Sequence, residues 1–322
     1  MTRQIRNREA GGGRDQQPPA TAQPATIRGL FHELVVPLLG RRLTRRHGLT
    51  VLMILPLALY IFGFTLLPVL DSIRLSFVDR LSGAFPSLAN YVEIIHRPDF
   101  VSSVVNTIGI AVIGVSLELV FGLMIALMLS RAFRGRGVFR TLVLTPLGVP
   151  TLVAGAAMIY IFGLQGYFNE LLLRLGLIDH QIYWTQSGLR GMLAVAIADT
   201  WKTTPLVILI LLAGLESIPG DIYEAASVDG ASGWRTFWDH TLPLLMPAIT
   251  MAIILRAIDA FRIFDVAIVL AGRQVPVMSS FVYFEYFAGD LNGASAAATL
   301  LLLLIVIFIV AYFLVVEHRE RA

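Results

Sequence analysis

The chain contains no cysteine and only one lysine, and charged residues are scarce along its 322 positions. Without cysteine it can form no disulfide framework, thiol nucleophile, Fe–S cluster or Cys-ligated zinc site. Only 15% of the residues are charged, against about 25% in an ordinary soluble domain. By contrast, 56% are apolar and the mean hydropathy is +0.74. This composition excludes a disordered chain and disfavours a soluble one, because a single core cannot bury so much apolar surface.

Motifs for covalent chemistry are also missing from the sequence. The lysine, Lys202, has no glycine before it, so the chain has no P-loop to hold a nucleotide. No two of the six histidines are four residues apart, and no serine lies in a G-x-S-x-G turn. We therefore expect that the chain is not an enzyme, and that it binds no metal, cofactor or nucleic acid itself.

Six apolar stretches are long enough to cross a bilayer as helices, which takes about 20 residues each. They cover residues 49–70, 104–129, 138–162, 190–213, 247–270 and 294–316. Because the stretches are continuous rather than alternating, they predict an all-α membrane protein with six transmembrane helices and not a barrel. Pro146 and Pro150 are expected to bend the third helix.

Arginine counts predict the orientation of these helices. Residues 1–48 hold nine arginines and three acids, and residues 130–140 hold four arginines and no acid. The segments 71–103, 163–189 and 271–293 each have a net charge of −1. The positive-inside rule therefore predicts a cytoplasmic N-terminus and a cytoplasmic 130–140 loop, and six spans return the C-terminus to the same side.

The domain organisation follows from these spans. Residues 1–26 are rich in Gly, Pro, Gln and Arg and predict a disordered cytoplasmic tail. They are not expected to form a signal peptide, because the first apolar run begins too late. Residues 27–48 are typical of a cytoplasmic helix lying in the membrane interface, although an ordinary linker fits equally well. The transmembrane domain would then cover residues 49–316, and residues 317–322 would be the cytoplasmic C-terminus.

The loop at 214–246, here called the acidic loop, breaks the charge pattern because it holds five acids and one arginine. Residues 221–227 predict a short helix that Gly230 ends in a left-handed conformation. Residues 232–240 supply the aromatic face of a second short helix, and two prolines, Pro243 and Pro247, are expected to break the chain before the fifth span. Such a helix–turn–helix could project into the cytoplasm to meet a partner, or pack on its own bundle.

This loop resembles the EAA loop of bacterial ABC-importer permeases, with the pattern E-A-A-x-x-D-G-A, then F, then L-P-x-x-x-P. The positions that fit are Glu224, Ala225, Ala226, Asp229, Gly230, Ala231, Phe237, Leu242, Pro243 and Pro247. His240 departs from the aliphatic residue that is usual there.

The resemblance extends from about residue 50 to the end of the chain. Asn90-Tyr91, Asp99-Phe100 and Asn106-Thr107 are similar to landmarks of sugar-importer permeases. The segments 201–205 and 256–265 resemble the carbohydrate branch, of the maltose, trehalose and glycerol-3-phosphate type. Residues 272–276 replace a glycine-rich turn of that family, so the outer loop 272–290 is expected to differ in shape.

The resemblance implies a type I ABC importer permease fold with cytoplasmic termini, in the bacterial cytoplasmic membrane. It implies four kinds of partner besides lipid: a second, different permease subunit, a dimeric ATP-binding subunit that holds ATP and Mg, an extracytoplasmic sugar-binding protein, and a sugar such as trehalose or maltose. It also implies that the EAA positions named above couple the chain to the ATPase, whose closure moves the loop as a lever.

Charges inside the expected spans are the second group of candidate residues. Arg256, Asp259, Arg262 and Asp265 alternate in sign at intervals of three, so neighbours can pair on a helix. Asp199 and Lys202 form a similar pair, and Glu118 needs a polar partner within the bundle.

These groups could either pin helices together or line a sugar path, where carboxylate, guanidinium and aromatic groups suit hydroxyls and an apolar ring face. Asn106 could likewise hydrogen-bond between helices. The candidate path residues are Asn106, Glu118, Trp201, Lys202, Thr203, Arg256, Asp259, Phe261, Arg262, Phe264 and Asp265.

Two other functions remain open on the sequence. An ion-gradient-driven secondary transporter would use the buried charges as a proton relay, and it would show internal repeats that we do not find. A membrane enzyme, such as a lipid-linked sugar transferase, would place the acids of the acidic loop at a metal or phosphate site.

Overall fold

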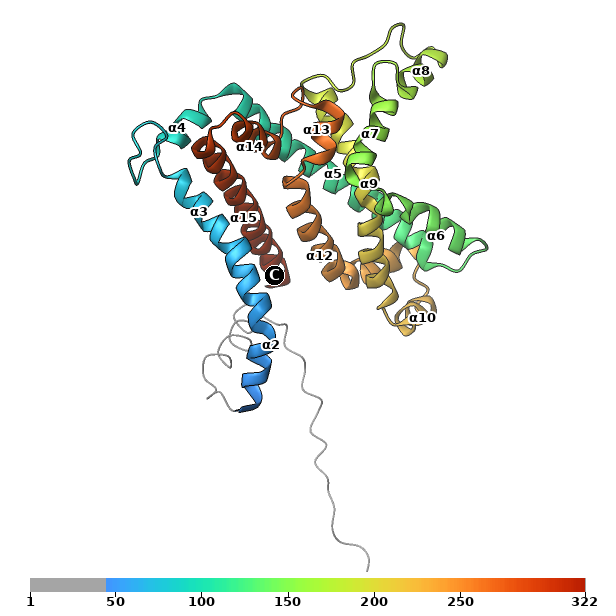
Figure 1. Ribbon diagram of the computed structural model, residues 1–322. Coiled ribbons are helices and arrows are strands. Elements are labelled where there is room, and N and C mark those ends of the chain that lie inside the picture. Colours follow the sequence, from blue (N-terminus) through green and yellow to red (C-terminus); the bar gives the residue numbers. More distant parts are fainter. Residues whose placement is uncertain (1–44, 322) are drawn as a thin grey trace, which may run out of the picture. The chain divides into compact units, whose positions relative to one another are not determined.

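A computed structural model describes residues 45–321, and this range is helical with no strand (Figure 1). The chain divides into two units, residues 1–65 and 66–322, which are treated separately. The expectations for the tail at 1–26 and for residues 27–44 lie outside the described residues.

The first unit contributes α2 (Arg45–Ile61), which continues into a π-helical turn at Phe62–Leu66. The side chains described between Leu52 and Thr65 are exposed, except for a half-buried Gly63. An apolar helix with this exposure is suited to a lipid or protein environment rather than to water.

The second unit contains the remaining helices. They are α3 (Leu67–Ser76), α4 (Ala89–Ile95), α5 (Pro98–Ser130), α6 (Arg136–Leu144), α7 (Thr151–Phe162), α8 (Tyr167–Arg174), α9 (Leu189–Glu216), α10 (Gly220–Val228), α11 (Gly233–Thr236), α12 (Leu242–Phe261), α13 (Asp265–Ala271), α14 (Met278–Phe287) and α15 (Leu291–Arg321). In this unit α3 and α14 both pack against α15 (Figure 1).

The core of the second unit is the packing of α5 against α9. Small residues let the two backbones approach, because a Cβ at Gly122 would lie 2.7 Å from Cγ1 of Val207. Ile208 and Leu211 of α9 are fully buried in the same cluster, together with Leu245 of α12. The pair of long helices therefore forms the base on which α12 lies.

Six helical segments are long and apolar enough to span a membrane, as the sequence predicts. They are Leu52–Ser76, Pro98–Ser130, Thr151–Arg174, Leu189–Glu216, Gly233–Phe261 and Leu291–Leu314.

Two of the expected spans differ in detail from the structure. Residues 138–162 do not form one helix, because a 3-10 turn at Thr145–Gly148 and an extended Val149 separate α6 from α7. Pro146 and Pro150, which lack an N–H, lie at this interruption. The fifth helix, expected to reach residue 270, ends at Phe261, and a separate helix, α13, begins at Asp265.

The segments between the helices sort to two ends of the second unit. At one end Arg136 of α6 pairs with Glu216 at the end of α9, with Nη2 and Oε1 3.1 Å apart, so the arginine-rich and acidic loops meet. At the other end Arg97 bridges to Glu285 of α14 at 2.9 Å. Hydrogen bonds to Asp99 and Glu285 raise the pKa of the Arg97 guanidinium above its ordinary value. This sorting agrees with the loop sides predicted from arginine counts.

The close approach of α5 and α9 predicts opposite effects for two glycines of α5. Gly122→Ala should destabilise the protein by about 1–3 kcal/mol, because Val207 cannot move away without disturbing the core. Gly109→Ala should be tolerated, since its Cβ would meet only the flexible end of Met192 and alanine favours a helix by about 1 kcal/mol. Thermal unfolding of the full chain in detergent measures both, and equal melting temperatures would contradict this account of the packing.

Candidate functional site

The acidic loop begins with α10, whose end is fixed by its glycine. Gly230 has a φ of +72°, as the sequence predicts. The N–H of Ala231 donates to the carbonyl of Ala226 at 2.9 Å, and the N–H of Gly230 donates to that of Ser227 at 3.1 Å. These two bonds form a Schellman motif, which explains why a glycine stands at position 230.

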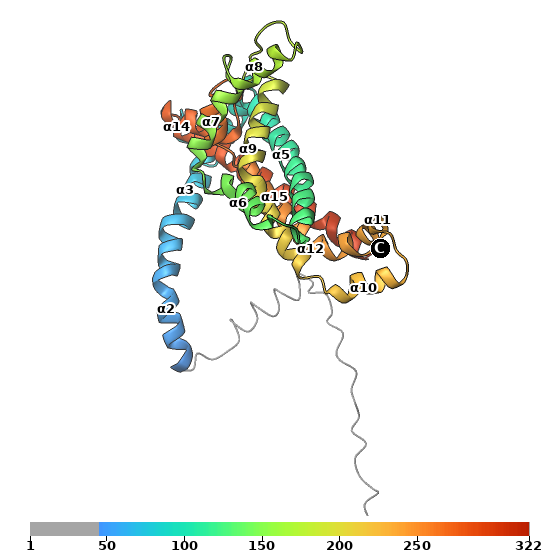
Figure 2. The ribbon, with the colours of Figure 1, turned by 90° about the vertical axis from the view of Figure 1, so that its right-hand side faces the viewer.

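The second half of the loop runs without a break into α12 (Figure 2). The Ser232 side chain accepts a hydrogen bond from the Arg235 N–H at 3.4 Å and caps α11. A π-helical turn at Phe237–Thr241 then leads directly to Leu242. Trp234, Phe237 and Trp238 pack together with ring centroids 5.3–6.4 Å apart, and Trp238 meets each of the other two rings edge to face.

The expected break at the two prolines is wrong. Pro243 directly follows the π-helical turn at Phe237–Thr241, and the helix continues through it. Pro247 lies inside α12 and removes one hydrogen bond to residue 243. The second half of the loop and the fifth span therefore form one helical segment, Gly233–Phe261.

The EAA positions divide between the surface and the interior of the loop. Exposed positions are Glu224, Ala225, Asp229, Gly230, Pro243 and Pro247. Ala226 is buried, and Ala231 and Phe237 are half-buried. The exposed Ala225 and Gly230 have a small side chain or none, so another backbone can approach this surface closely.

The intramembrane charges gather around one guanidinium, and we call Glu118, Asp199, Arg256 and Asp259 the ion cluster. Arg256 donates from Nε to Glu118 Oε2 at 2.6 Å and from Nη2 to Glu118 Oε1 at 3.0 Å. Its Nη2 also lies 3.2 Å from Asp199 Oδ2, and its Nη1 contacts Asp259. The cluster therefore joins α5, α9 and α12.

Burial differs sharply within the ion cluster. The side chains of Arg256 and Glu118 are 1% and 0% exposed, whereas that of Asp259 is 67% exposed. Thr203 adds a hydrogen bond from Oγ1 to Glu118 Oε1 at 2.8 Å. Two fully buried charges are tolerable only with such complete pairing, and every buried side-chain nitrogen and oxygen among the described residues has a partner.

Two predicted pairings are wrong. Asp199 pairs with Arg256 rather than with Lys202, whose Nζ donates to the carbonyl of Leu147 at 3.2 Å. That carbonyl would bond to residue 150 in a continued 3-10 helix, but residue 150 is a proline without an N–H. The alternating ladder of charges also stops at Asp259, because α12 ends before Arg262 and Asp265 starts α13.

The other candidate path residues differ in burial and in their contacts. Asn106 donates from Nδ2 to the carbonyl of Pro276 at 2.9 Å. Phe261 is buried against Phe308, with ring centroids 5.2 Å apart. The exposed or half-buried candidates are Trp201, Thr203, Asp259, Arg262, Phe264 and Asp265.

Sequence reasoning missed the partner of Glu118, because Arg256 lies 138 residues away and no local spacing connects them. It also missed Asn169, which is buried and organises the segment between α7 and α9. The Asn169 side chain accepts hydrogen bonds from the Ile182 N–H at 3.1 Å and from Trp184 Nε1 at 2.9 Å. A single asparagine in a short amphipathic segment gives no signal of this role.

The sequence of this chain matches a known protein family. The family model for binding-protein-dependent transport system inner membrane components matches residues 118–322, which include the ion cluster and the acidic loop.

Two curated relatives match most of the chain. The trehalose/maltose transport system permease protein MalF of Thermococcus litoralis is 40% identical over 71% of this chain and 78% of its own length. The trehalose transport system permease protein SugA of Mycobacterium tuberculosis is 36% identical over 72% of this chain and 76% of its own length.

A solved structure of a bacterial ABC transporter involved in the import of the acidic polysaccharide alginate superposes with a TM-score of 0.74. It covers 86% of this chain and 96% of the solved chain at 20% sequence identity, which shows a common fold. Together with six candidate spans and the matched family model, these similarities show that the chain is a multi-pass membrane protein that belongs to the family of binding-protein-dependent transport system inner membrane components.

Proposed function

We propose that this chain is one of two different membrane subunits of an ATP-driven importer for a di- or oligosaccharide such as trehalose or maltose. The relatives at 40% and 36% identity both carry trehalose in their names, and the first also carries maltose, which supports this substrate class. Membership of a binding-protein-dependent family argues against both an ion-driven secondary transporter and a membrane enzyme.

The observation that carries the proposal is the continuity between the acidic loop and the ion cluster. The loop enters α12 at Leu242 without a break, and Arg256 lies about 21 Å further along the same helix axis. A displacement of the loop is therefore transmitted along α12 to Arg256, and through its ion pairs to α5 and α9. A separate dimeric ATPase, holding ATP and Mg, would supply that displacement through the exposed EAA positions.

The sugar path is assigned to the exposed side of the ion cluster. A charged side chain is costly in hydrocarbon, and yet Asp259 is 67% exposed near the end of an apolar span. A carboxylate suits the hydroxyls of a sugar, so we place the path here rather than at the buried Phe261. An extracytoplasmic sugar-binding protein would deliver the substrate to it.

The substrate proposal is tested by uptake. Cells that lack this chain should lose high-affinity uptake of radiolabelled trehalose or maltose, and the intact gene should restore it. Uptake of sn-glycerol-3-phosphate is the comparison, because relatives with that name are also similar to this chain. Loss of glycerol-3-phosphate uptake with unchanged disaccharide uptake would contradict the substrate assignment.

The coupling role predicts that Gly230→Ala lowers both sugar uptake and substrate-stimulated ATP hydrolysis by about fivefold. This factor corresponds to the low end of the coupling free energies typical of allosteric proteins. The cause is strain of about 1 kcal/mol at a φ of +72°, which loosens the end of α10.

Gly135→Ala is the matched control, because Gly135 has a φ of +86° and, like Gly230, no atom within 4 Å of its added Cβ. It lies between α5 and α6, outside the acidic loop. Equal losses in the two variants, with normal membrane insertion of both, would refute a specific role of the acidic loop.

The ion cluster predicts different outcomes for its buried and exposed members. Arg256→Met leaves two buried carboxylates without a cation and should destabilise the chain by about 3–5 kcal/mol, which reduces the assembled complex. Asp259→Asn should change stability by less than about 1 kcal/mol because the residue is exposed, and should instead alter the KM for sugar uptake.

Complex yield and uptake kinetics in lipid vesicles separate these outcomes. The double variant Arg256→Met/Glu118→Gln should recover part of the yield. If Asp259→Asn lost assembled complex as severely as Arg256→Met, Asp259 would have a structural role and the path assignment would fail.

A further inference from the structure

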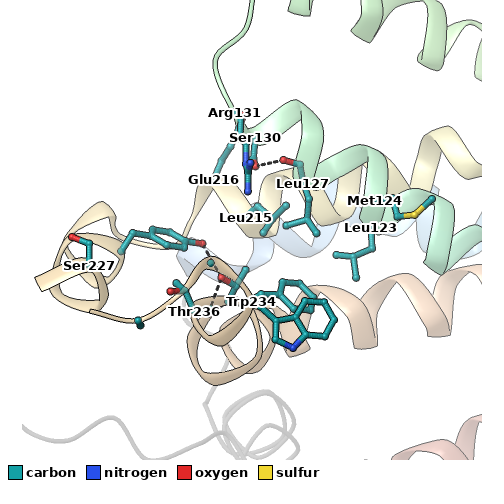
Figure 3. A pocket seen from close by; sticks show the side chains of 15 residues that line it. Leu123, Met124, Leu127, Ser130, Arg131, Leu215, Glu216, Ser227, Trp234 and Thr236 are labelled. Carbon is teal, nitrogen blue, oxygen red and sulfur yellow. Dashed lines mark hydrogen bonds between the residues drawn. The ribbon is translucent and has the colours of Figure 1, made fainter. Parts of the chain in front are cut away.

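A cavity of about 810 Å³ lies between the acidic loop and the ends of α5 and α9 (Figure 3). Its volume is in the range of small-molecule sites. The deep wall is apolar, with Leu123, Leu127 and Leu215, and Trp234 covers one side. Two EAA positions, the half-buried Ala231 and Phe237, line this space, whereas none of the candidate path residues does.

One arginine in the lining of the cavity has no carboxylate partner among the described residues. Two charged side chains line the cavity, Glu216 and Arg131. Glu216 is already paired with Arg136 at 3.1 Å, whereas the exposed Arg131 has no carboxylate partner among the described residues. The hydroxyl of Tyr223 also lines the cavity and lies 3.5 Å from Thr241 Oγ1. A guanidinium without a carboxylate partner, together with a phenol hydroxyl, favours an anionic group here.

An apolar route connects the cavity with the surface of α5. Four exposed apolar side chains of α5 are spaced four or eight residues apart, which places them on one side of the helix. They are Val112, Val120, Met124 and Met128, with exposures of 46–56%. Met124 also lines the cavity, so the apolar face continues into it, and Arg131 lies about two turns beyond.

We propose that this cavity binds one anionic phospholipid, with the phosphate at Arg131 and Tyr223 and an acyl chain against Met124 and Leu127. A polar head and an apolar tail are the two parts of a ligand that a charged mouth and an apolar wall fit together. Trp234 at the edge fits the position of interfacial aromatic residues in membrane proteins. The lipid would fill the space between the acidic loop and α5 and so set the position of the loop.

The binding site itself does not depend on the proposed function, whereas its effect on coupling does. Binding is therefore tested on the purified full chain, and coupling separately on the assembled importer in nanodiscs. A failure of lipid binding would refute the site, and a failure of ATP-driven uptake with lipid still bound would concern only the proposed function.

The binding experiment compares dioleoyl phosphatidylglycerol with dioleoyl phosphatidylcholine by native mass spectrometry. The chain should retain the anionic lipid preferentially. Arg131→Gln should lower its affinity by about fivefold, which corresponds to about 1 kcal/mol for one arginine near the membrane surface. Arg134→Gln is the matched control, because Arg134 is exposed in the same loop and does not line the cavity. Equal affinities of the two variants, or equal retention of the two lipids, would overturn the proposal.

The acyl position is tested by narrowing the cavity. Met124→Trp should reduce phosphatidylglycerol retention. Met128→Trp should not, because Met128 is also exposed on the same helix but lies outside the cavity. Phosphatidylglycerol with brominated acyl chains should quench the fluorescence of Trp234. The quenched part of the tryptophan fluorescence should therefore be lost in Trp234→Phe and kept in Trp184→Phe.

The same quenching is measured in the assembled importer. Quenching that persists there supports a resident lipid. Quenching that disappears on assembly would mean that a partner subunit fills the cavity, and the lipid proposal would be wrong.

Discussion

The second unit depends on one buried guanidinium. Arg256 is held by both oxygens of Glu118 and by Asp199 in a segment that is otherwise apolar. In such surroundings neither charge is stable without the other, so the helices that carry them cannot separate without leaving a charge unpaired. This constraint fixes the mutual register of α5, α9 and α12 more strictly than apolar packing alone, because apolar contacts between helices can slide while a bidentate pair cannot.

The same constraint gives the acidic loop its mechanical significance. A loop that ended in flexible chain would dissipate any displacement, but this loop is closed by a Schellman motif at Gly230 and runs into α12 through a π-helical turn. One unbroken helical segment therefore reaches from Gly233 in the acidic loop to Arg256. The third carboxylate, Asp259, shares the guanidinium while remaining open to its surroundings, so events at the exposed surface and in the buried pair act on the same cation.

Much of this architecture could be predicted from the sequence, because membrane burial imposes simple rules. The six spans follow from apolar length, and the helix that Gly230 ends follows from local backbone preference. The sorting of loops into two ends agrees with the arginine counts. The family resemblance rested on the E-A-A-x-x-D-G-A spacing, and the family model and curated relatives support it.

What the sequence could not provide were contacts between distant residues and the exact ends of helices. Asp199 and Lys202 are adjacent on α9, and local spacing therefore favoured a pair, but Arg256 and the Leu147 carbonyl compete successfully for them. The prolines were equally ambiguous. Pro146 and Pro150 interrupt a helix, whereas Pro243 and Pro247 are accommodated within one. Position within the helix does not explain the difference, since Pro247 lies inside α12 and is still accommodated. The outcome depends on the packing around each proline, which is a tertiary property.

The contrast between α9 and α15 has a consequence for how the sequence can change over time. In the most apolar part of α9, 56% of the residues are buried, whereas in that of α15 only 11% are. The exposed face of α15, with Leu303, Ile307 and Val310, needs only apolar side chains, so leucine, isoleucine and valine are interchangeable there. On α9 most side chains pack against neighbouring helices, and their size and shape are therefore constrained. Homologous chains should therefore drift freely along α15 while α9 stays nearly constant, although both helices read as similar apolar runs.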